Sequence, residues 1–136
     1  MNRDTTSVLI ADKVPHVRSA LRLLLCQASD FAVVGEAADT AHAAALALEQ
    51  CPDLVLLEWE LPGQNGSSAV TKLEAAQPGL TVIAVSARPE ARGAALAAGA
   101  DAFVSKLDPP ERLLATMRDC VAKRHNSSET RREAEQ

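Results

Sequence analysis

The chain has 136 residues, of which 47% are hydrophobic and 24% are charged, and its formal net charge is −4. This length predicts a single domain, and the sequence holds neither an apolar run long enough for a membrane span nor a basic stripe for nucleic acid. Aromatic residues make up only 2% of the chain, which excludes a platform of rings for stacking single-stranded nucleic acid.

Three scattered cysteines have no CxxC spacing, so the sequence predicts buried, reduced thiols rather than a metal site. No signal-peptide pattern precedes the first apolar run, and we therefore expect a cytoplasmic protein.

Five short apolar runs predict strands. They lie at 8–11, 31–34, 54–57, 81–85 and 102–104. The first, third and fourth runs do not alternate with polar residues, which is typical of strands buried on both faces of a parallel sheet.

Helical patterns fill the intervals between these runs. The first is a stripe that begins at Val17 and ends at Leu25, and the second spans about 40–50 after Asp39, a candidate N-cap. A third stripe covers 69–76, a fourth helix can start at Pro89 and end at Gly99, and a fifth covers 113–121.

Five strand-then-helix units predict an α/β fold with a doubly wound, five-stranded parallel sheet. We expect one domain over 1–123, followed by a polar tail over 124–136 that is frayed or disordered. In such folds the functional site lies at the carboxyl ends of the strands.

Polar residues follow four of the five predicted strands. The first strand ends at Asp12 and Lys13, the third at 58–60 (Glu-Trp-Glu), the fourth at Ser86 and the fifth at Lys106. These ends meet at one edge of the sheet, where they form either a chemical site or ordinary polar strand caps.

Enzymatic alternatives find little support at the same edge. The turn after the first strand has no glycine and contains Pro15, which removes a donor that a phosphate would need. No GxSxG elbow is present, and Ser86 has no histidine nearby in the sequence. We therefore expect no enzyme activity, and a flavodoxin-like protein that binds a small molecule is kept as an alternative.

Several segments resemble the receiver domain of bacterial two-component response regulators, most closely the subgroup that usually precedes a helix-turn-helix module. They are VLIAD at 8–12, VVGEAAD at 33–39, PDLVLLEWELPGQNG at 52–66, VIAVSA at 82–87 and AAGADAFVSK at 97–106. The resemblance covers about residues 7–123 and implies the (βα)5, flavodoxin-like receiver fold.

The resemblance also implies a site. Receivers carry an acidic pair that binds a divalent metal, an aspartate that accepts a phosphoryl group from a histidine kinase, a hydroxyl, a lysine and a switch aromatic. Asp12 matches the first acid, Ser86 the hydroxyl, Lys106 the lysine and Phe103 the aromatic, while 62–63 match the loop after the acceptor.

Two central positions depart from the family. Lys13 replaces a metal-ligating acid, and Glu58 replaces the acceptor aspartate. Mg²⁺ is usually held by one or two carboxylates, and an added like charge ~4 Å away costs roughly 4 kcal/mol at an effective dielectric of 20. The longer Glu58 side chain moves its carboxylate by about 1 Å, enough to cost roughly 100-fold in a positioned reaction. We therefore predict that Mg²⁺ binding is lost.

These departures favour an atypical pseudo-receiver that acts by protein contact. In this hypothesis Lys13 and Lys106 neutralise Asp12, Glu58 and Glu60, and whether Glu58 mimics a phosphorylated aspartate stays open. The alternative is a single-domain response regulator that still accepts a phosphoryl group at Asp12 or Glu58.

The resemblance places the partner surface on the fourth helix, fifth strand and fifth helix, and homodimerisation through it stays open. Because few residues follow 123, we expect a stand-alone receiver that touches neither nucleic acid nor membrane directly.

Overall fold

The computed structural model describes the backbone of residues 5–135 and the side chains of residues 5–124. Five strands form one parallel sheet in the order β2-β1-β3-β4-β5, which confirms the predicted fold class. The strands are β1 (Thr6–Ala11), β2 (Phe31–Ala37), β3 (Leu54–Glu58), β4 (Thr81–Ser86) and β5 (Ala102–Ser105). The helices are α1 (Pro15–Cys26), α2 (Thr40–Gln50), α3 (Gly66–Ala76), the 3₁₀ turn η1 (Pro89–Ala91), α4 (Arg92–Ala97) and α5 (Pro110–Glu135).

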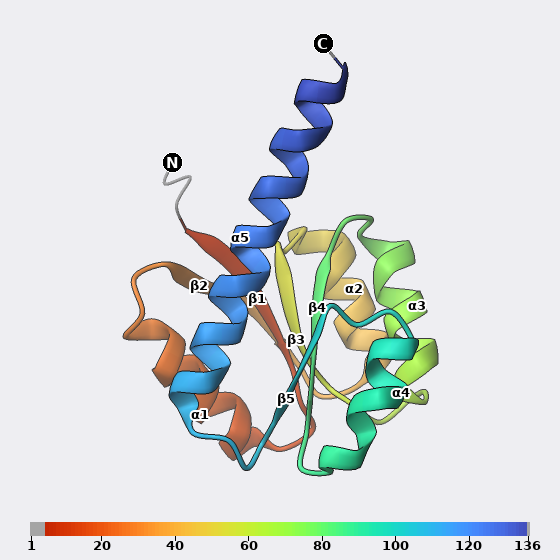
Figure 1. The fold of residues 1–136 in the computed structure, drawn as a ribbon. Helices are drawn as coiled ribbons and strands as arrows, with labels where there is room; N and C mark the ends of the chain where they lie inside the picture. The colour runs from red at the N-terminus through yellow and green to blue at the C-terminus, as the bar shows by residue number, and fades with distance from the viewer. Residues whose placement is uncertain (1–4, 136) are drawn as a thin grey trace.

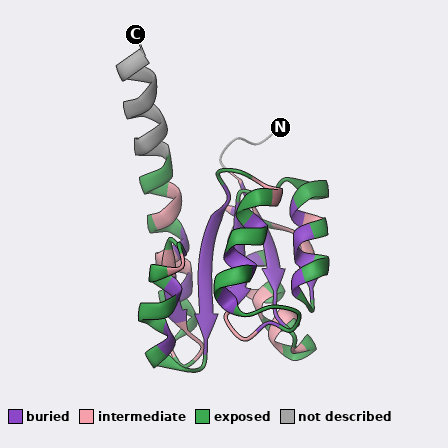
Figure 2. Cartoon of the chain, turned by 90° about the vertical axis from the view of Figure 1, so that its right-hand side faces the viewer, coloured by how far each residue is buried: buried purple, intermediate pink, exposed green. Residues whose placement is uncertain are grey.

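The helices cover both faces of the sheet (Figure 1). Helices α1 and α5 pack on one face, where Leu25 and Met117 join a buried cluster with Ile10 and Leu56. Helices α2, α3 and α4 pack on the other, over a cluster built largely from alanine, valine and leucine. The small side chains let these helices lie close to the sheet. Figure 2 shows the strands as the buried layer and exposed residues on the outer helix surfaces.

The three runs without alternation are the central strands. Every residue of β3 and β4 is buried, and in β1 only Ser7 is not. Burial on both faces explains why these strands read as continuous apolar runs. Strand β2 lies at an edge of the sheet and is correspondingly more open.

Local signals for helix ends are borne out in detail. The Asp39 carboxylate accepts the His42 N–H at 2.8 Å and caps α2, and Gly99 takes a φ of +109° just after α4. Pro89 starts the fourth helical segment, but its first turn is 3₁₀ (η1) and the α-helix proper covers only six residues.

The pairing of β1 with β2 contains a bulge. The register passes from Val8 opposite Val33 to Leu9 opposite Gly35, so Val34 has no partner across the ladder. A bulge of this kind bends the strand and increases its local twist.

Two sequence predictions need correction or stay open. The thiols of Cys26 and Cys51 are exposed rather than buried, because each residue lies at the C-terminal end of a helix, and Cys120 is only partly buried. The backbone of helix α5 extends to Glu135, beyond the expected domain end at 123. The frayed tail predicted for 124–136 falls almost wholly outside the residues whose side chains are described, so it stays a prediction. Within the described residues, no helix is long and apolar enough to cross a membrane.

Candidate functional site

The carboxyl ends of β1, β3, β4 and β5 meet at one edge of the sheet, the lower edge in Figure 1. They bring Asp12, Glu58, Ser86 and Lys106 together, as the strand order predicts. Asp12 and Glu58 are each only 3% exposed, and Ser86 is fully buried. Buried polar groups of this kind need partners inside the protein.

Lys106 joins the two acids. Its Nζ lies 2.9 Å from Asp12 Oδ2 and 2.7 Å from Glu58 Oε2. Burial alone would lower the pKa of Lys106, but its hydrogen bonds to Glu58 and Asp12 raise that pKa above its ordinary value. The ammonium therefore stays charged and serves two carboxylates at once.

The remaining carboxylate oxygens are held by the backbone. Glu58 Oε1 accepts the Lys13 N–H at 3.0 Å, and Asp12 Oδ1 accepts the Val14 N–H at 2.9 Å. The Arg18 guanidinium in turn donates to the Asp12 carbonyl at 2.7 Å. All four carboxylate oxygens of Asp12 and Glu58 thus have a donor from the chain itself.

Lys13 takes a different role from the one predicted. Its side chain is exposed and its ammonium forms no ion pair with any described residue; only its backbone N–H reaches Glu58. The position between the two carboxylates is taken by the Lys106 ammonium instead.

Glu60 also departs from the prediction, since it pairs with a hydroxyl rather than with a lysine. The Ser86 hydroxyl donates to the Glu60 carboxylate, with Oγ 2.8 Å from Oε2 and 3.0 Å from Oε1. The Arg88 N–H donates to the same Ser86 Oγ at 3.0 Å. The sequence predicts only that Glu60 and Ser86 reach the same edge of the sheet. It does not predict which group each side chain contacts.

The two aromatic residues near this edge are packed differently. Phe103 is buried in the cluster beneath α4, together with Ala91 and Ala95. Trp59 is half-buried, and its indole lies directly over Gly66 at the start of α3, where a Cβ would clash with the ring. Gly66 is therefore the residue that makes room for Trp59.

The loop after β3 is fixed to α2. The Pro62 carbonyl accepts hydrogen bonds from the backbone N–H of Thr40 at 2.9 Å and from its hydroxyl at 3.1 Å. Gly63 adopts a φ of +114° beside the Thr40 side chain, a conformation that favours glycine.

A cavity of about 390 Å³ opens beside this edge, between α1 and α5. It is lined in part by the apolar stripe of α1, including Val17 and Leu21, and otherwise by residues of β4, β5 and the start of α5, including Leu113. His16 and Asp108 lie at its polar margin.

The donor set of the edge fits Mg²⁺ poorly. Mg²⁺ needs open oxygen ligands in near-octahedral array, whereas here an ammonium occupies the space between Asp12 and Glu58. Among the described residues, no group of three or more acidic, histidine or cysteine side chains is arranged to hold a metal.

The sheet order and the set of acid, hydroxyl and lysine at its carboxyl edge define a receiver domain, and known proteins agree. The response regulator receiver domain family matches residues 8–118. The nitrate/nitrite response regulator protein NarL of Escherichia coli K12 is 35% identical over 123 residues, which are 89% of this chain and 57% of that protein. This chain belongs to the response regulator receiver domain family.

Solved receivers superpose closely on the fold. The receiver domain of the putative response regulator NarL from Mycobacterium tuberculosis has a TM-score of 0.78 and 28% identity, covering 86% of this chain and 96% of that chain. A LuxR-family response regulator from Aurantimonas sp. SI85-9A1 has a TM-score of 0.81 and 29% identity, covering 88% and 86%. The chain spans about half the length of the curated relatives it matches.

Proposed function

We propose that this receiver signals through protein contacts without accepting a phosphoryl group, and that it neither binds Mg²⁺ at the carboxyl edge nor catalyses a reaction. One observation carries the proposal: the Lys106 ammonium binds both Asp12 and Glu58, at 2.9 and 2.7 Å. This internal cation takes the place that a metal would need, next to a glutamate where the family has its acceptor aspartate.

The saturation of the site supports the same proposal. A phosphoryl group must displace existing hydrogen-bond partners before it can use the Ser86 hydroxyl or the Lys106 ammonium, because Ser86 already donates to Glu60 and Lys106 already binds two acids. Each displaced buried charge would then be left without a partner, at a cost of several kcal/mol.

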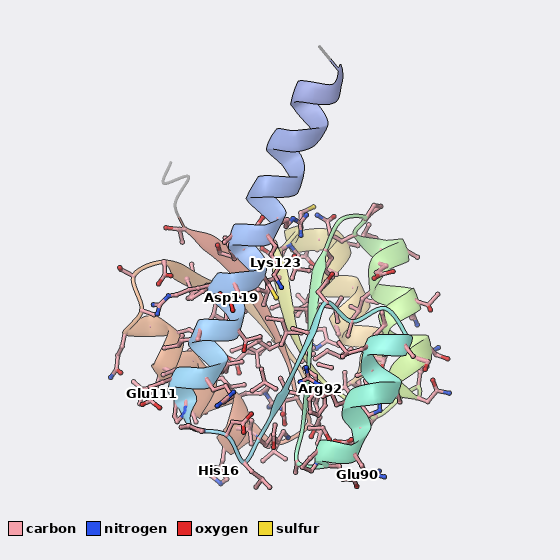
Figure 3. All side chains as sticks on the ribbon, viewed as in Figure 1. His16, Glu90, Arg92, Glu111, Asp119 and Lys123 are labelled. Carbon is pink, nitrogen blue, oxygen red and sulfur yellow. The ribbon has the colours of Figure 1, made fainter. Side chains whose placement is uncertain are left out.

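The partner surface proposed for this receiver is the face formed by α4, β5 and α5. Exposed charges of both signs stand along it, and Figure 3 labels Glu90 and Arg92 on one side and Glu111, Asp119 and Lys123 on α5. Leu96 and Leu107 are exposed there as well. Mixed charge with scattered apolar residues suits a protein partner better than a nucleic acid. Homodimerisation would use the same face.

The deciding experiment is incubation with a small phosphodonor and Mg²⁺, followed by intact mass measurement. We expect no phosphorylated species for the natural chain. The matched control is the double variant Lys13→Asp with Glu58→Asp, which restores both family residues and should gain one phosphoryl group. Phosphorylation of the natural chain at Asp12 or Glu58 would contradict the proposal and favour a single-domain regulator that still uses phosphate.

Trp59 gives an independent readout, because it directly follows Glu58 and packs at the same edge. We expect its fluorescence to be unchanged by millimolar Mg²⁺ in the natural chain and to respond in the restored double variant. A saturable change in the natural chain would show that a metal site survives.

A further inference from the structure

The Ser86 hydroxyl connects three segments of the chain. It donates a hydrogen bond to the Glu60 carboxylate after β3, and its oxygen accepts one from the Arg88 N–H at the turn from β4 into η1. Ser86 itself is fully buried, and its hydrogen bonds to the two partners are partly buried. The start of the η1–α4 segment is therefore fixed, through one hydroxyl, to a carboxylate on the neighbouring strand end.

The charge of Glu60 matters for this contact. A hydrogen bond to an ionised acceptor is roughly twice as strong as one between neutral groups, and the carboxylate orients the hydroxyl proton away from the Arg88 N–H. Ser86 Oγ is thereby left free to accept that N–H. Without the carboxylate, the hydroxyl could rotate and the partly buried hydrogen bond from the Arg88 N–H would weaken.

The η1–α4 segment has few other polar anchors. Neither η1 nor α4 has a side-chain cap, α4 is six residues long, and Gly93 faces open space. The nearby ion pair of Arg88 with Glu90 is largely exposed and contributes little. Its apolar anchors are the small side chains of Ala91 and Ala95, beside Phe103. The hydrogen bond from the Arg88 N–H to Ser86 Oγ is thus one of the few polar contacts that position the start of this segment.

We propose that Glu60 is a built-in lock that holds α4 in one position through the Ser86 hydroxyl. This inference rests on the proposed function, because a receiver without phosphorylation needs another means to fix its partner surface. Glu60 is then the carboxylate that holds the Ser86 hydroxyl, whereas Glu58 binds Lys106 and the backbone N–H of Lys13.

Amide hydrogen exchange on the full chain tests the lock. In Glu60→Ala we expect the amides of Arg88 and of 92–98 to exchange about tenfold faster, the change that a loss of about 1.4 kcal/mol produces, while amides of β1 and β3 stay near their natural rates. Ser86→Ala should give the same pattern, and the double variant should add less than twofold. Glu49→Ala is the matched control, since it removes an exposed glutamate whose carboxylate accepts a hydrogen bond only from Gln50 among the described residues.

Glu60→Gln is a second variant that distinguishes the loss of this contact from a general loss of stability. It keeps the length of the side chain and one acceptor oxygen, so α4 should exchange faster than in the natural chain but slower than in Glu60→Ala. Unchanged α4 rates in Glu60→Ala, or equal acceleration of α4, β1 and β3 in both variants, would overturn the lock. Neither of these results changes the outcome of the phosphodonor experiment. Phosphorylation of the natural chain would contradict the proposed function but would not change the exchange rates, so the two proposals can fail separately.

Discussion

The two ends of the sheet use the same chemistry at very different depths. At the carboxyl end, Asp12 and Glu58 are almost completely buried around the Lys106 ammonium. At the amino end, Arg118 forms a bidentate pair of hydrogen bonds to Asp30, at 2.8 and 3.0 Å. The Arg118 side chain is 52% exposed and the Asp30 side chain 40% exposed. Burial rather than the number of bonds separates these ion pairs.

The difference shows which end tolerates change. Removing one member of a buried ion pair leaves an unpaired charge in a region of low dielectric and costs about 3–5 kcal/mol. An exposed pair loses only a screened interaction that water largely replaces. The carboxyl end is therefore a closed set of mutually dependent residues, whereas the amino end fastens α5 and β2 with separable contacts.

The largest effect is expected for Lys106→Met, which keeps the length of the side chain but leaves Asp12 and Glu58 without their shared cation. We predict a loss of about 3 kcal/mol in the free energy of unfolding, measured by urea denaturation at neutral pH. A loss below about 1 kcal/mol would show that the carboxyl end is as tolerant as the amino end.

The same cation predicts a loss of stability at alkaline pH. Burial acts to lower the pKa of Lys106, but the hydrogen bonds to Glu58 and Asp12 prevail and raise it above 10.5. The folded state thus holds this proton more tightly than the unfolded state, so the contribution is complete below pH 10.5 and disappears as the pH rises through the raised value. Urea denaturation at several pH values across this range should show the free energy of unfolding falling in the natural chain. The fall should be smaller in Lys106→Met.

Gly66→Ala tests how tightly the carboxyl end is packed. The added Cβ would clash with the Trp59 indole, so the ring or the start of α3 must move. We expect a loss of about 2 kcal/mol together with a shift in Trp59 emission. Gly93→Ala is the control, because a Cβ there meets nothing within 4 Å and should not destabilise the protein.

Cys51→Gly should stabilise the amino end slightly. Cys51 follows α2 in the left-handed region, at φ 47° and ψ 55°, which costs a residue with a Cβ more than it costs glycine. After the greater flexibility of glycine in the unfolded chain is subtracted, we expect a gain of about 0.5 kcal/mol in thermal or urea unfolding. Cys51→Ala removes the thiol but keeps the Cβ, so it should give no such gain.

The smallest effect is expected for Arg118→Met at the exposed pair. The hydrogen bond from Arg118 lowers the pKa of Asp30 below its ordinary 3.8, so the contribution is present above that pH and is lost as the pH falls below it. The variant should therefore match the natural chain at acid pH and differ from it slightly near neutrality. Added salt should reduce the difference, and a difference as large as that of Lys106→Met would erase the contrast between the two ends.

Much of this arrangement follows from the sequence. Continuous apolar runs identify the central strands, Asp39 and Gly99 mark helix ends, and parallel topology alone brings Asp12, Glu58, Ser86 and Lys106 to one edge. The hydrogen-bond partners do not follow in the same way. Lys13 and Lys106 each follow a strand, yet only Lys106, directly after β5, places its ammonium between the acids, and the strand order alone does not distinguish the two lysines.

Glu60 shows the same limit more clearly. Its charge suggested a lysine partner, but the group that donates to its carboxylate is the buried Ser86 hydroxyl. Which carboxylate takes which donor depends on side-chain conformations at the end of the sheet, and these depend on packing that no local pattern encodes. The exposure of Cys26 and Cys51 has a similar origin, since a one-residue step around a helix end moves a side chain from core to surface.

The register shift between β1 and β2 affects how the edges of the sheet can pair with other chains. An exposed sheet edge is a template onto which another chain can add a strand, and this sheet has two edges, β2 and β5. The ladder of β2 is interrupted at Val34, and β5 is only four residues long. Neither offers a long, flat row of free N–H and C=O groups. Each edge is therefore a poor template for the addition of a strand from another chain.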